Sequence, residues 1–388
     1  MTVKTFKGYA RENGDFGIRN HLLIIPTVIC SNQVVNRIAQ LVPDSVAIPH
    51  QHGCSQIGAD KDRTFDVLAG TGMNPNVGAV LIVSLGCEVV DPQQLAETIR
   101  ATGKPVEFFD IQNVGGSVKA IQHGAEIARR LRAELDRTKM VDVPYSALRV
   151  GVKCGGSDAT SGLASNPALG VAADTVIGEG GSIVIGETTE IIGAEHILAE
   201  RCQDENVSAK LYEIVHRFER EVEKVGADMR GGNPSPGNIA GGLSTIEEKS
   251  LGCISKCGTA PIRAVIEYAE QIPNGGLYFM DSPGNDIECV SGMAAGGAHI
   301  VCFTTGRGTP TGAAVSPVIK ITANQRMYDR MSDNMDVNVS GLLTGELDLA
   351  EAGALIGNEI FEVAAGKLTK AEILGHQEFS INRIGPSL

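Results

Sequence analysis

Short runs of hydrophobic residues alternate along this chain with longer segments in which hydrophobic residues recur at helical spacing. Six of the runs have the length of a strand and are continuous rather than alternating, which is typical of strands buried on both faces of a parallel sheet. These runs lie at residues 22–28, 78–83, 106–109, 148–152, 182–185 and 299–303. The pattern therefore predicts parallel sheets.

The segments between these runs favour amphipathic helices. The clearest spans residues 117–137, where Val118, Ile121 and Leu131 fall near helical spacing and Arg129 and Glu134 take the outer face. Strand, glycine turn and helix recur, which predicts an α/β fold of open, mostly parallel sheets flanked by helices, in two Rossmann-like domains. A break near residues 140–146 predicts a first α/β domain of residues 1–145 and a C-terminal α/β domain of residues 146–388 that carries glycine-rich active-site loops.

Composition narrows the class of protein. The chain has 388 residues, 47 glycines and a formal net charge of -13, which suits a compact enzyme and argues against a surface that coats nucleic acid. It has no run of 18 apolar residues and no apolar signal segment, so we expect no membrane contact and a cytoplasmic location. Nine cysteines without a CxxC pair suit reduced thiols or metal ligands better than disulfides.

Six short segments place glycine beside a cysteine, a serine or an acid, at residues 50–54, 84–88, 154–158, 233–238, 250–253 and 304–310. Three of them directly follow predicted strands, and open α/β sheets bind ligands beyond the carboxyl ends of their strands. Glycine also lets backbone N–H groups approach a ligand closely. The segments therefore predict an enzyme with one polar, anion-holding site built from several loops.

Histidines and cysteines in these segments are candidate metal ligands. The alternatives are hydrogen bonding within a loop for the histidines and small buried residues under tight turns for the cysteines. The candidates are His50, His52, Cys54, Cys87 and Cys253. Cys30, Cys202, Cys289 and Cys302 lie in apolar or helical stretches and are predicted to be core residues, and so is His299.

The candidate substrate ligands are polar or cationic. Arg19 and Arg307, each beside glycine, are predicted to clamp a carboxylate, with a surface salt bridge as the alternative. Ser157 and Ser161 are predicted to hold hydroxyl groups or to cap a helix. Asn238, Thr309 and Thr311 complete this set, and the competing candidates for the catalytic acid or base are Glu88, Lys153, Asp158 and Asp286.

At these segments the sequence resembles the altronate/galactarate dehydratase family, which contains the catalytic part of the sugar-acid dehydratases and the large subunit of sulfolactate sulfo-lyase. The resemblance covers nearly the whole chain. It is carried by GYARENG (8–14), GIRN (17–20), GCSQ (53–56), LGCE (85–88), CGGSD (154–158), NPSPGN (233–238), KSLGC (249–253), PGND (283–286) and TGRGTP (305–310).

The resemblance implies a β-elimination. A base removes the proton on carbon 2 of a small anionic 2-hydroxy acid, and a group then leaves carbon 3 to give a 2-keto acid. It also implies dependence on Fe²⁺, with other divalent metals as alternatives. Sugar-acid members carry a small histidine-rich β domain ahead of this region. Because the motifs start at residue 8 here, we expect a separate small β-rich subunit and an oligomeric enzyme.

Two departures from the sugar-acid members bear on the substrate. Thr311 stands where those enzymes have a tyrosine, and Lys153 stands where the altronate enzymes have an acidic residue. An added cation suits a sulfonate, so the leading expectation is (2R)-3-sulfolactate, cleaved to pyruvate and bisulfite. Altronate or a related sugar acid is the alternative, and a non-catalytic sugar-acid-binding protein is a weaker one. A nicotinamide enzyme lacks support because no GxGxxG follows the first predicted strand.

Overall fold

A four-stranded parallel sheet organises the first part of the chain in the computed structural model, which describes residues 4–385 except for the side chains of residues 230 and 231. Its order is β4 (Ser45–Ala47), β3 (His21–Pro26), β5 (Val77–Ser84) and β6 (Val106–Asp110). One face packs on α1 (Asn32–Leu41) and α5 (Ser117–Leu135), and the other packs on α2 (Ala59–Met73) and α3 (Pro92–Arg100).

A seven-stranded parallel sheet organises the second part. Its order is β10 (Ile262–Ile266), β11 (Gly276–Met280), β9 (Ser182–Ile185), β8 (Arg149–Cys154), β12 (Ile300–Thr304), β13 (Val318–Thr322) and β14 (Val337–Asn338). The larger core cluster unites one face with α6 (Asn166–Gly178), α8 (Glu205–Lys224), α11 (Ile246–Ile254) and α15 (Leu349–Ala364). The other face packs on α12 (Asp286–Ala295).

The remaining elements are short. An antiparallel sheet of β2 (Phe16–Gly17), β1 (Thr5–Ala10) and β7 (Val141–Pro144) joins the start of the chain to the segment that connects the two larger sheets. The other helices are α4 (Ile111–Val114), α7 (Glu195–Ala199), α9 (Met229–Gly232), α10 (Pro236–Ala240), α13 (Gln325–Arg330), α14 (Gly341–Thr344) and α16 (Lys370–Leu374), with single turns at Ile29–Ser31, Tyr145–Ala147, Ser161–Ser165, Thr188–Glu190 and Ser255–Cys257.

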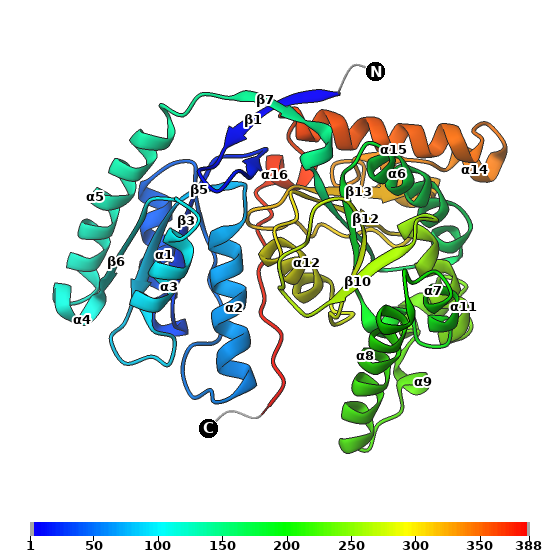
Figure 1. Cartoon of the computed structure of the whole chain (residues 1–388), viewed down its shortest axis with the longest axis horizontal. Coiled ribbons are helices and arrows are strands. Elements are labelled where there is room, and N and C mark those ends of the chain that lie inside the picture. The colour runs from blue at the N-terminus through cyan, green and yellow to red at the C-terminus, as the bar shows by residue number, and fades with distance from the viewer. Residues whose placement is uncertain (1–3, 386–388) are drawn as a thin grey trace.

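The two larger sheets contact each other through α2 and α12, which pack together (Figure 1). The segment that follows α16, red in Figure 1, runs between these helices. There the carboxylate of Asp60 accepts hydrogen bonds from the N–H groups of Ile384 and Gly385. The C-terminal residues thus pack against the four-stranded sheet's side of the molecule.

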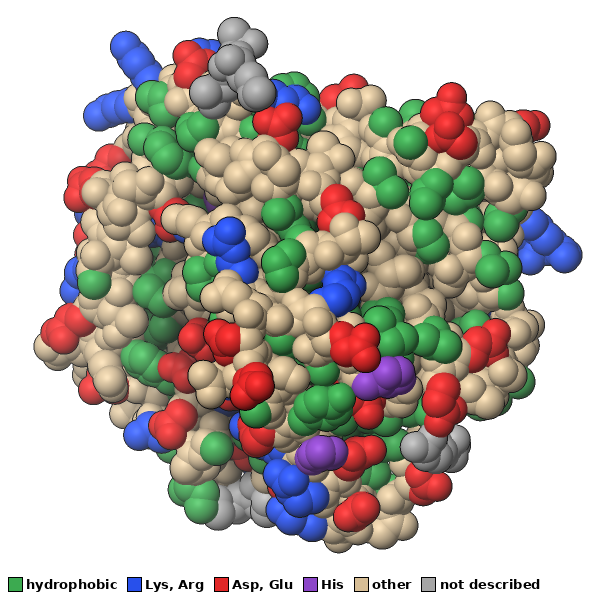
Figure 2. Space-filling view, turned by 45° about the vertical axis from the view of Figure 1, so that its right-hand side comes forward, with side chains coloured by type: hydrophobic (Ala, Val, Ile, Leu, Met, Phe, Trp, Pro, Cys, Tyr) green, Lys and Arg blue, Asp and Glu red, His purple; other side chains and the backbone are tan. Residues whose placement is uncertain are grey.

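The structure confirms the predicted α/β class. All six predicted runs form strands of the two parallel sheets, and the predicted helix at 117–137 is α5. The division into domains at residue 145 stays a prediction. Figure 2 shows acidic side chains spread over one face, with lysine and arginine scattered among them, as expected from the net charge of -13. Within residues 4–385, no helix has both the length and the apolar character needed to span a membrane.

Candidate active site

Several charged and polar residues lie at the carboxyl edge of the seven-stranded sheet. Lys153 lies at the end of β8, and Asp286 begins α12 after β11. Glu187 follows β9, and Asn324 follows β13. Because all these strands are parallel, their carboxyl ends meet at one edge, which is where open α/β sheets bind ligands.

A buried network of charges underlies this edge. The side chains of Lys153, Glu187 and Lys256 are fully buried. Lys153 Nζ lies 2.5 Å from Glu187 and 2.8 Å from Asp286, whose side chain is 37% exposed. Lys256 Nζ lies 3.1 Å from the second Glu187 oxygen, which also accepts a hydrogen bond from the N–H of Cys154. Asp286 is thus the solvent-accessible member of a network whose other charged side chains are buried.

These ion pairs keep the buried groups charged. Burial opposes the charged form of Lys153, but the carboxylates of Glu187 and Asp286 outweigh it and hold its pKa well above 10.5. Burial would raise the pKa of Glu187, yet Lys153 and Lys256 hold it below 4.5. For Glu190, which pairs with Lys249 at 2.9 Å, burial prevails and its pKa is raised. Paired buried charges of this kind are costly to break singly.

Two buried thiols lie next to this network. A hydrogen bond between them lowers the pKa of Cys154 and raises the pKa of Cys253, so Cys154 is the thiol that ionises first. Lys256 Nζ lies 2.6 Å from the Cys253 sulfur and 3.5 Å from the Cys154 sulfur. The lysine charge therefore favours ionisation of Cys154.

Cys154, Glu187 and Cys253 bring three ligand atoms within 4.8 Å of one another and form a candidate metal site. The Lys256 ammonium group contacts all three of these side chains. One cation thus already neutralises this donor set, and a metal ion would bind there only if Lys256 moved or lost its proton. The set fits a buried lysine better than it fits Fe²⁺.

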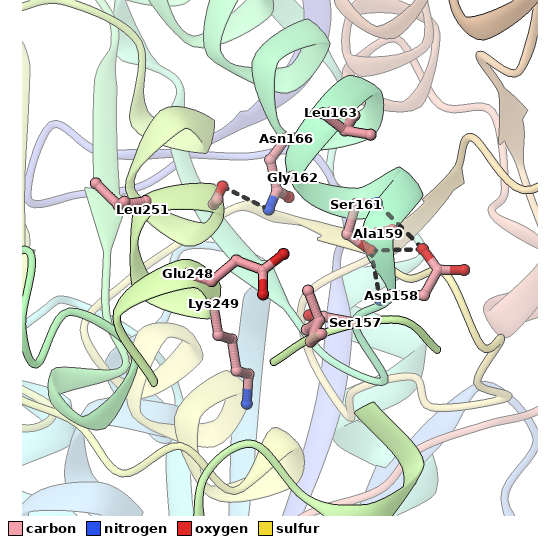
Figure 3. A pocket seen from close by; sticks show the side chains of 12 residues that line it. Ser157, Asp158, Ala159, Ser161, Gly162, Leu163, Asn166, Glu248, Lys249 and Leu251 are labelled. Carbon is pink, nitrogen blue, oxygen red and sulfur yellow. Dashed lines mark hydrogen bonds between the residues drawn. The ribbon is translucent and has the colours of Figure 1, made fainter. Parts of the chain in front are cut away.

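Two adjoining cavities share Asp158 at this edge. One, of about 310 Å³, is lined by residues that include Ser157, Ser161, Glu248 and Lys249 (Figure 3). Ser157 and Ser161 come from the segment after β8, and Glu248 and Lys249 come from α11. Lys249 also donates a hydrogen bond to Asn233 at 2.7 Å, which ties α11 to the glycine-rich segment at 233–238.

The second cavity, of about 410 Å³, is lined by Asp158, Asn324 and three exposed arginines. These are Arg307 from the loop after β12 and Arg326 and Arg330 from α13. Such a concentration of guanidinium groups suits an anionic ligand, because each group can bind a carboxylate or a sulfonate through two N–H donors.

Both oxygens of Asp158 have protein partners. One accepts from the N–H groups of Thr160 and Ser161, and the other accepts from Asn324 at 2.9 Å. Asn238 donates to the carbonyl oxygen of Ser157 at 2.9 Å. Asp158 and Asn238 therefore shape the loop that lines both cavities.

Thr309 and Thr311 follow Arg307 in the same loop, and their hydroxyl groups are hydrogen-bonded to each other at 2.8 Å. The structure thus brings together most of the predicted catalytic and substrate-binding residues in the second part of the chain. Among the predicted residues that lie elsewhere, Arg19 forms an ion pair with Glu372 at 2.7 Å and donates to three backbone carbonyls.

The remaining candidates lie at the carboxyl edge of the four-stranded sheet. His50 and His52 are buried, and their Nε2 atoms bond to the carbonyl oxygens of Pro26 and Ile381. Burial lowers the pKa of His50 to about 4. Its Nδ1 accepts the His52 N–H at 3.1 Å, so both ring nitrogens are occupied by backbone groups. Cys54 and Cys87, by contrast, are exposed thiols.

Glu88, which follows Cys87, forms hydrogen bonds within its own loop. Glu88 accepts hydrogen bonds from the N–H groups of Leu85, Gly86 and Cys87 and from the hydroxyl of Thr27. Burial would raise the pKa of Glu88, but these hydrogen bonds outweigh it and lower the pKa below 4.5. A carboxylate held in this way orders the loop that presents Cys87.

One prediction about the core is wrong. Cys30 is exposed because it lies in the turn after β3 rather than in the strand, and Ser31 takes the buried position. Cys289 and Cys302 are buried as predicted, whereas Cys202 is only partly buried and packs against the larger core cluster. His299 is also a core residue, bonded to the Phe16 carbonyl at 2.6 Å.

Sequence reasoning missed several residues of the site: Glu187, Glu190, Lys249, Lys256, Arg326 and Arg330. Glu187 directly follows a predicted strand, so the rule that pointed to Asp158 could have found it. Its φ of +69° is rare for a residue with a side chain, but it is visible only in the structure. Lys256 carries no comparable signal in the sequence.

Comparisons with known proteins agree on one family. Residues 145–387 match the family described as D-galactarate/altronate dehydratase, C-terminal, and residues 8–136 match D-galactarate dehydratase/altronate hydrolase, second domain. The chain is 39% identical to altronate dehydratase of Bacillus subtilis, over 99% of this chain and 79% of that protein. It is also 39% identical to (2R)-sulfolactate sulfo-lyase subunit beta of Chromohalobacter salexigens, over 98% of both chains. Galactarate dehydratase (L-threo-forming) of Escherichia coli is 33% identical over 94% of this chain and 73% of its own.

Proposed function

This chain belongs to the D-galactarate/altronate dehydratase family and is an enzyme of the lyase class, and we propose that it catalyses β-elimination from a small anionic 2-hydroxy acid. The product is a 2-keto acid. The observation that carries the proposal is the pairing of Asp286, which solvent reaches, with the fully buried Lys153. This pairing supplies a fixed carboxylate against Gly155, in the segment whose next residues line the two cavities.

Asp286 is the proposed base. Its carboxylate accepts the proton from carbon 2, and Lys153 holds that carboxylate in place through the 2.8 Å ion pair. Gly155 lies directly against Asp286, since a β-carbon on Gly155 would fall 2.3 Å from its carboxylate oxygen. Ser157, which lines the first cavity, lies two residues further along the same segment. Lys153 thereby acts as a positioning residue rather than as a ligand of the substrate.

Cations and hydroxyl groups are proposed to bind the substrate. Arg307 takes the carboxylate or the anionic leaving group, helped by the two arginines of α13. Ser157 and Ser161 take hydroxyl groups in the adjoining cavity. Neutralising the carboxylate makes the proton on carbon 2 more acidic, so the same contacts that bind the substrate also promote its ionisation. Fe²⁺, when bound, would supply further Lewis-acid stabilisation of that charge.

The leading substrate is (2R)-3-sulfolactate, cleaved to pyruvate and bisulfite, with a small β-rich second subunit as partner. The relative named sulfolactate sulfo-lyase subunit beta, which implies a further subunit, supports this choice. Thr311 supports it as well, because a small paired hydroxyl stands where the sugar-acid members have a tyrosine ring. Altronate is the second candidate, favoured by an equally similar altronate dehydratase. We also propose a reducing compartment such as the cytoplasm, which the nine free cysteines support.

The test is a substrate panel. The chain is purified without oxygen, alone and with a candidate small subunit, and is incubated with Fe²⁺ and either sulfolactate, altronate or galactarate. We expect 2-keto acid and sulfite in equal amounts from sulfolactate, and only when both subunits are present. If altronate is the one acid that yields a 2-keto acid, altronate replaces sulfolactate as the leading substrate. Absence of any 2-keto acid across the panel would overturn the lyase proposal for these substrates.

A further inference from the structure

Exposed cysteines gather at one place in this molecule. Of the nine cysteines, all of which lie in the described part of the chain, only Cys30, Cys54 and Cys87 are exposed. Cysteine is among the most frequently buried residue types, so three exposed thiols need an explanation. Each follows one of three adjacent strands, β3, β4 and β5, and so each lies at the carboxyl edge of the four-stranded sheet.

Backbone hydrogen bonds join the three loops directly. The N–H of Ile29 donates to the carbonyl oxygen of His52 at 2.9 Å, which sets the Cys30 turn beside the Cys54 loop. The N–H of Val89 donates to the carbonyl oxygen of Gly53 at 3.0 Å, which sets the Cys87 loop on its other side. The Cys54 loop thus lies between the two other cysteine-bearing loops.

The junction of the three cysteine-bearing loops is closely packed. Gly53 has a φ of +94°, and a β-carbon there would lie 2.1 Å from the carbonyl oxygen of Thr27, so only glycine fits. Ser55 also adopts a positive φ, of +54°. The Glu88 carboxylate orders the third loop through the N–H groups described above. A backbone held in this way at three exposed thiols is typical of a site prepared for a ligand.

A buried acceptor lies in the same loop. His52 is 3% exposed, and its Nε2 is hydrogen-bonded to a carbonyl oxygen, so that nitrogen carries the proton. Its Nδ1 is then a lone-pair acceptor, and it has no hydrogen-bond partner in the described part of the chain. Buried polar atoms without partners are rare, and a bound ion or water is one explanation for such an atom.

The spacing of the thiols decides what kind of group they can hold. Three thiolates around one tetrahedral ion lie about 3.8 Å apart, as follows from metal–sulfur bonds of about 2.3 Å. Among the described residues, only Cys154, Glu187 and Cys253 bring three such atoms within 4.8 Å of one another. The three exposed sulfur atoms therefore do not all lie within 4.8 Å of one another, as a single ion would require, whereas a cluster of several irons bridges wider gaps between cysteines.

We propose that Cys30, Cys54 and Cys87 hold an iron–sulfur cluster of the four-iron, four-sulfide type. Three thiolates would ligate three of its irons and leave the fourth open to an oxygen ligand from solvent or substrate. The buried Cys154–Cys253 pair, whose charge Lys256 already balances, would take no part. This cofactor site serves the proposed lyase function, but its existence does not depend on which acid is cleaved.

The test measures the cofactor rather than turnover. The full chain is reconstituted without oxygen using ferrous iron and sulfide, and iron and acid-labile sulfide are counted per chain. We expect about four of each in the wild type, with visible charge-transfer absorption and an electron paramagnetic resonance signal after reduction. Each of Cys30→Ser, Cys54→Ser and Cys87→Ser should lose more than half of the iron and sulfide. Before reconstitution, each should keep the melting temperature of the cluster-free wild type, because these side chains are exposed.

Cys202→Ser and Cys253→Ser are the matched controls and should keep the full cluster. Iron bound without labile sulfide, or a cluster that survives all three exposed-cysteine variants, would overturn the proposal, as would cluster loss confined to Cys253→Ser. If the cluster is bound but no acid in the panel is turned over, the proposed function is wrong and the cluster site stands. If protein without labile sulfide turns over an acid, the proposed function stands and the cluster proposal is wrong.

Discussion

The ammonium nitrogen of Lys153 lies 2.8 Å from a carboxylate oxygen of Asp286 and so links a fully buried charge to an acid that solvent can reach. Lys153 is also held from behind by Glu187. Because the buried partner is fixed on both sides, the exposed carboxylate loses little further freedom when a substrate binds. A base positioned in this way contributes to the rate mainly through orientation.

The first prediction concerns Asp286. Asp286→Asn keeps the size of the side chain but removes its ability to accept a proton, so kcat should fall at least 100-fold. The melting temperature should change little, because Lys153 keeps its pair with Glu187. Glu288→Gln, two residues further along α12, is the control and should stay within about threefold of wild type. Equal activity losses in both variants would mean that Asp286 is not the base.

The second prediction concerns the stability of the buried network. Glu187→Gln leaves the ammonium groups of Lys153 and Lys256 buried without their shared carboxylate. The free energy of unfolding, measured in urea, should fall by about 3–5 kcal/mol. Glu221→Gln, which breaks an exposed pair with Lys224, should change it by less than about 0.5 kcal/mol. A Glu187→Gln variant as stable as this control would show that the two lysines are not charged in the folded protein.

The fold and one edge of the site were accessible from the sequence because they depend on local pattern. Continuous hydrophobic runs marked the buried strands, and the rule that ligands bind at carboxyl ends pointed to Asp158 and Arg307. The pairing of Lys153 with Glu187 was not accessible, because it joins residues 34 positions apart on neighbouring strands. The exposure of Cys30 was missed because a hydrophobic run does not show where its strand ends.

The third prediction concerns acid sensitivity. Burial lowers the pKa of His21, His50 and His299 to about 4, from an ordinary value of 6.5. Between these values the unfolded chain binds more protons than the folded chain, so stability is complete above pH 6.5 and is lost as the pH falls towards 4. Each histidine adds about 1.4 kcal/mol per pH unit to this slope.

Substituting one of these histidines tests the cause of that slope. His299→Gln removes one titrating group and should lower the slope between pH 6.5 and 4 by about 1.4 kcal/mol per pH unit, even if the variant is less stable throughout. Urea unfolding at half-unit pH intervals measures it. The surface variant His196→Gln should leave the slope unchanged. An unaltered slope in His299→Gln would mean that this histidine is protonated equally in both states.

The last prediction separates the two candidate substrates at Thr311. This residue is 9% exposed, and its hydroxyl is paired with that of Thr309 in the loop that also carries Arg307, so a tyrosine ring there must break this pairing and displace its neighbours. A ring suits a polyhydroxylated chain but crowds a compact sulfonate. Thr311→Tyr should therefore lower kcat/KM for sulfolactate about tenfold, or about 1.4 kcal/mol, and change kcat/KM for altronate less than threefold. Thr311→Val, which removes the hydroxyl without adding a ring, separates the loss of the hydrogen bond from crowding and should affect both substrates alike. If Thr311→Tyr slows both substrates equally, the ring does not select between them, and the choice of sulfolactate would rest on the relative's name alone.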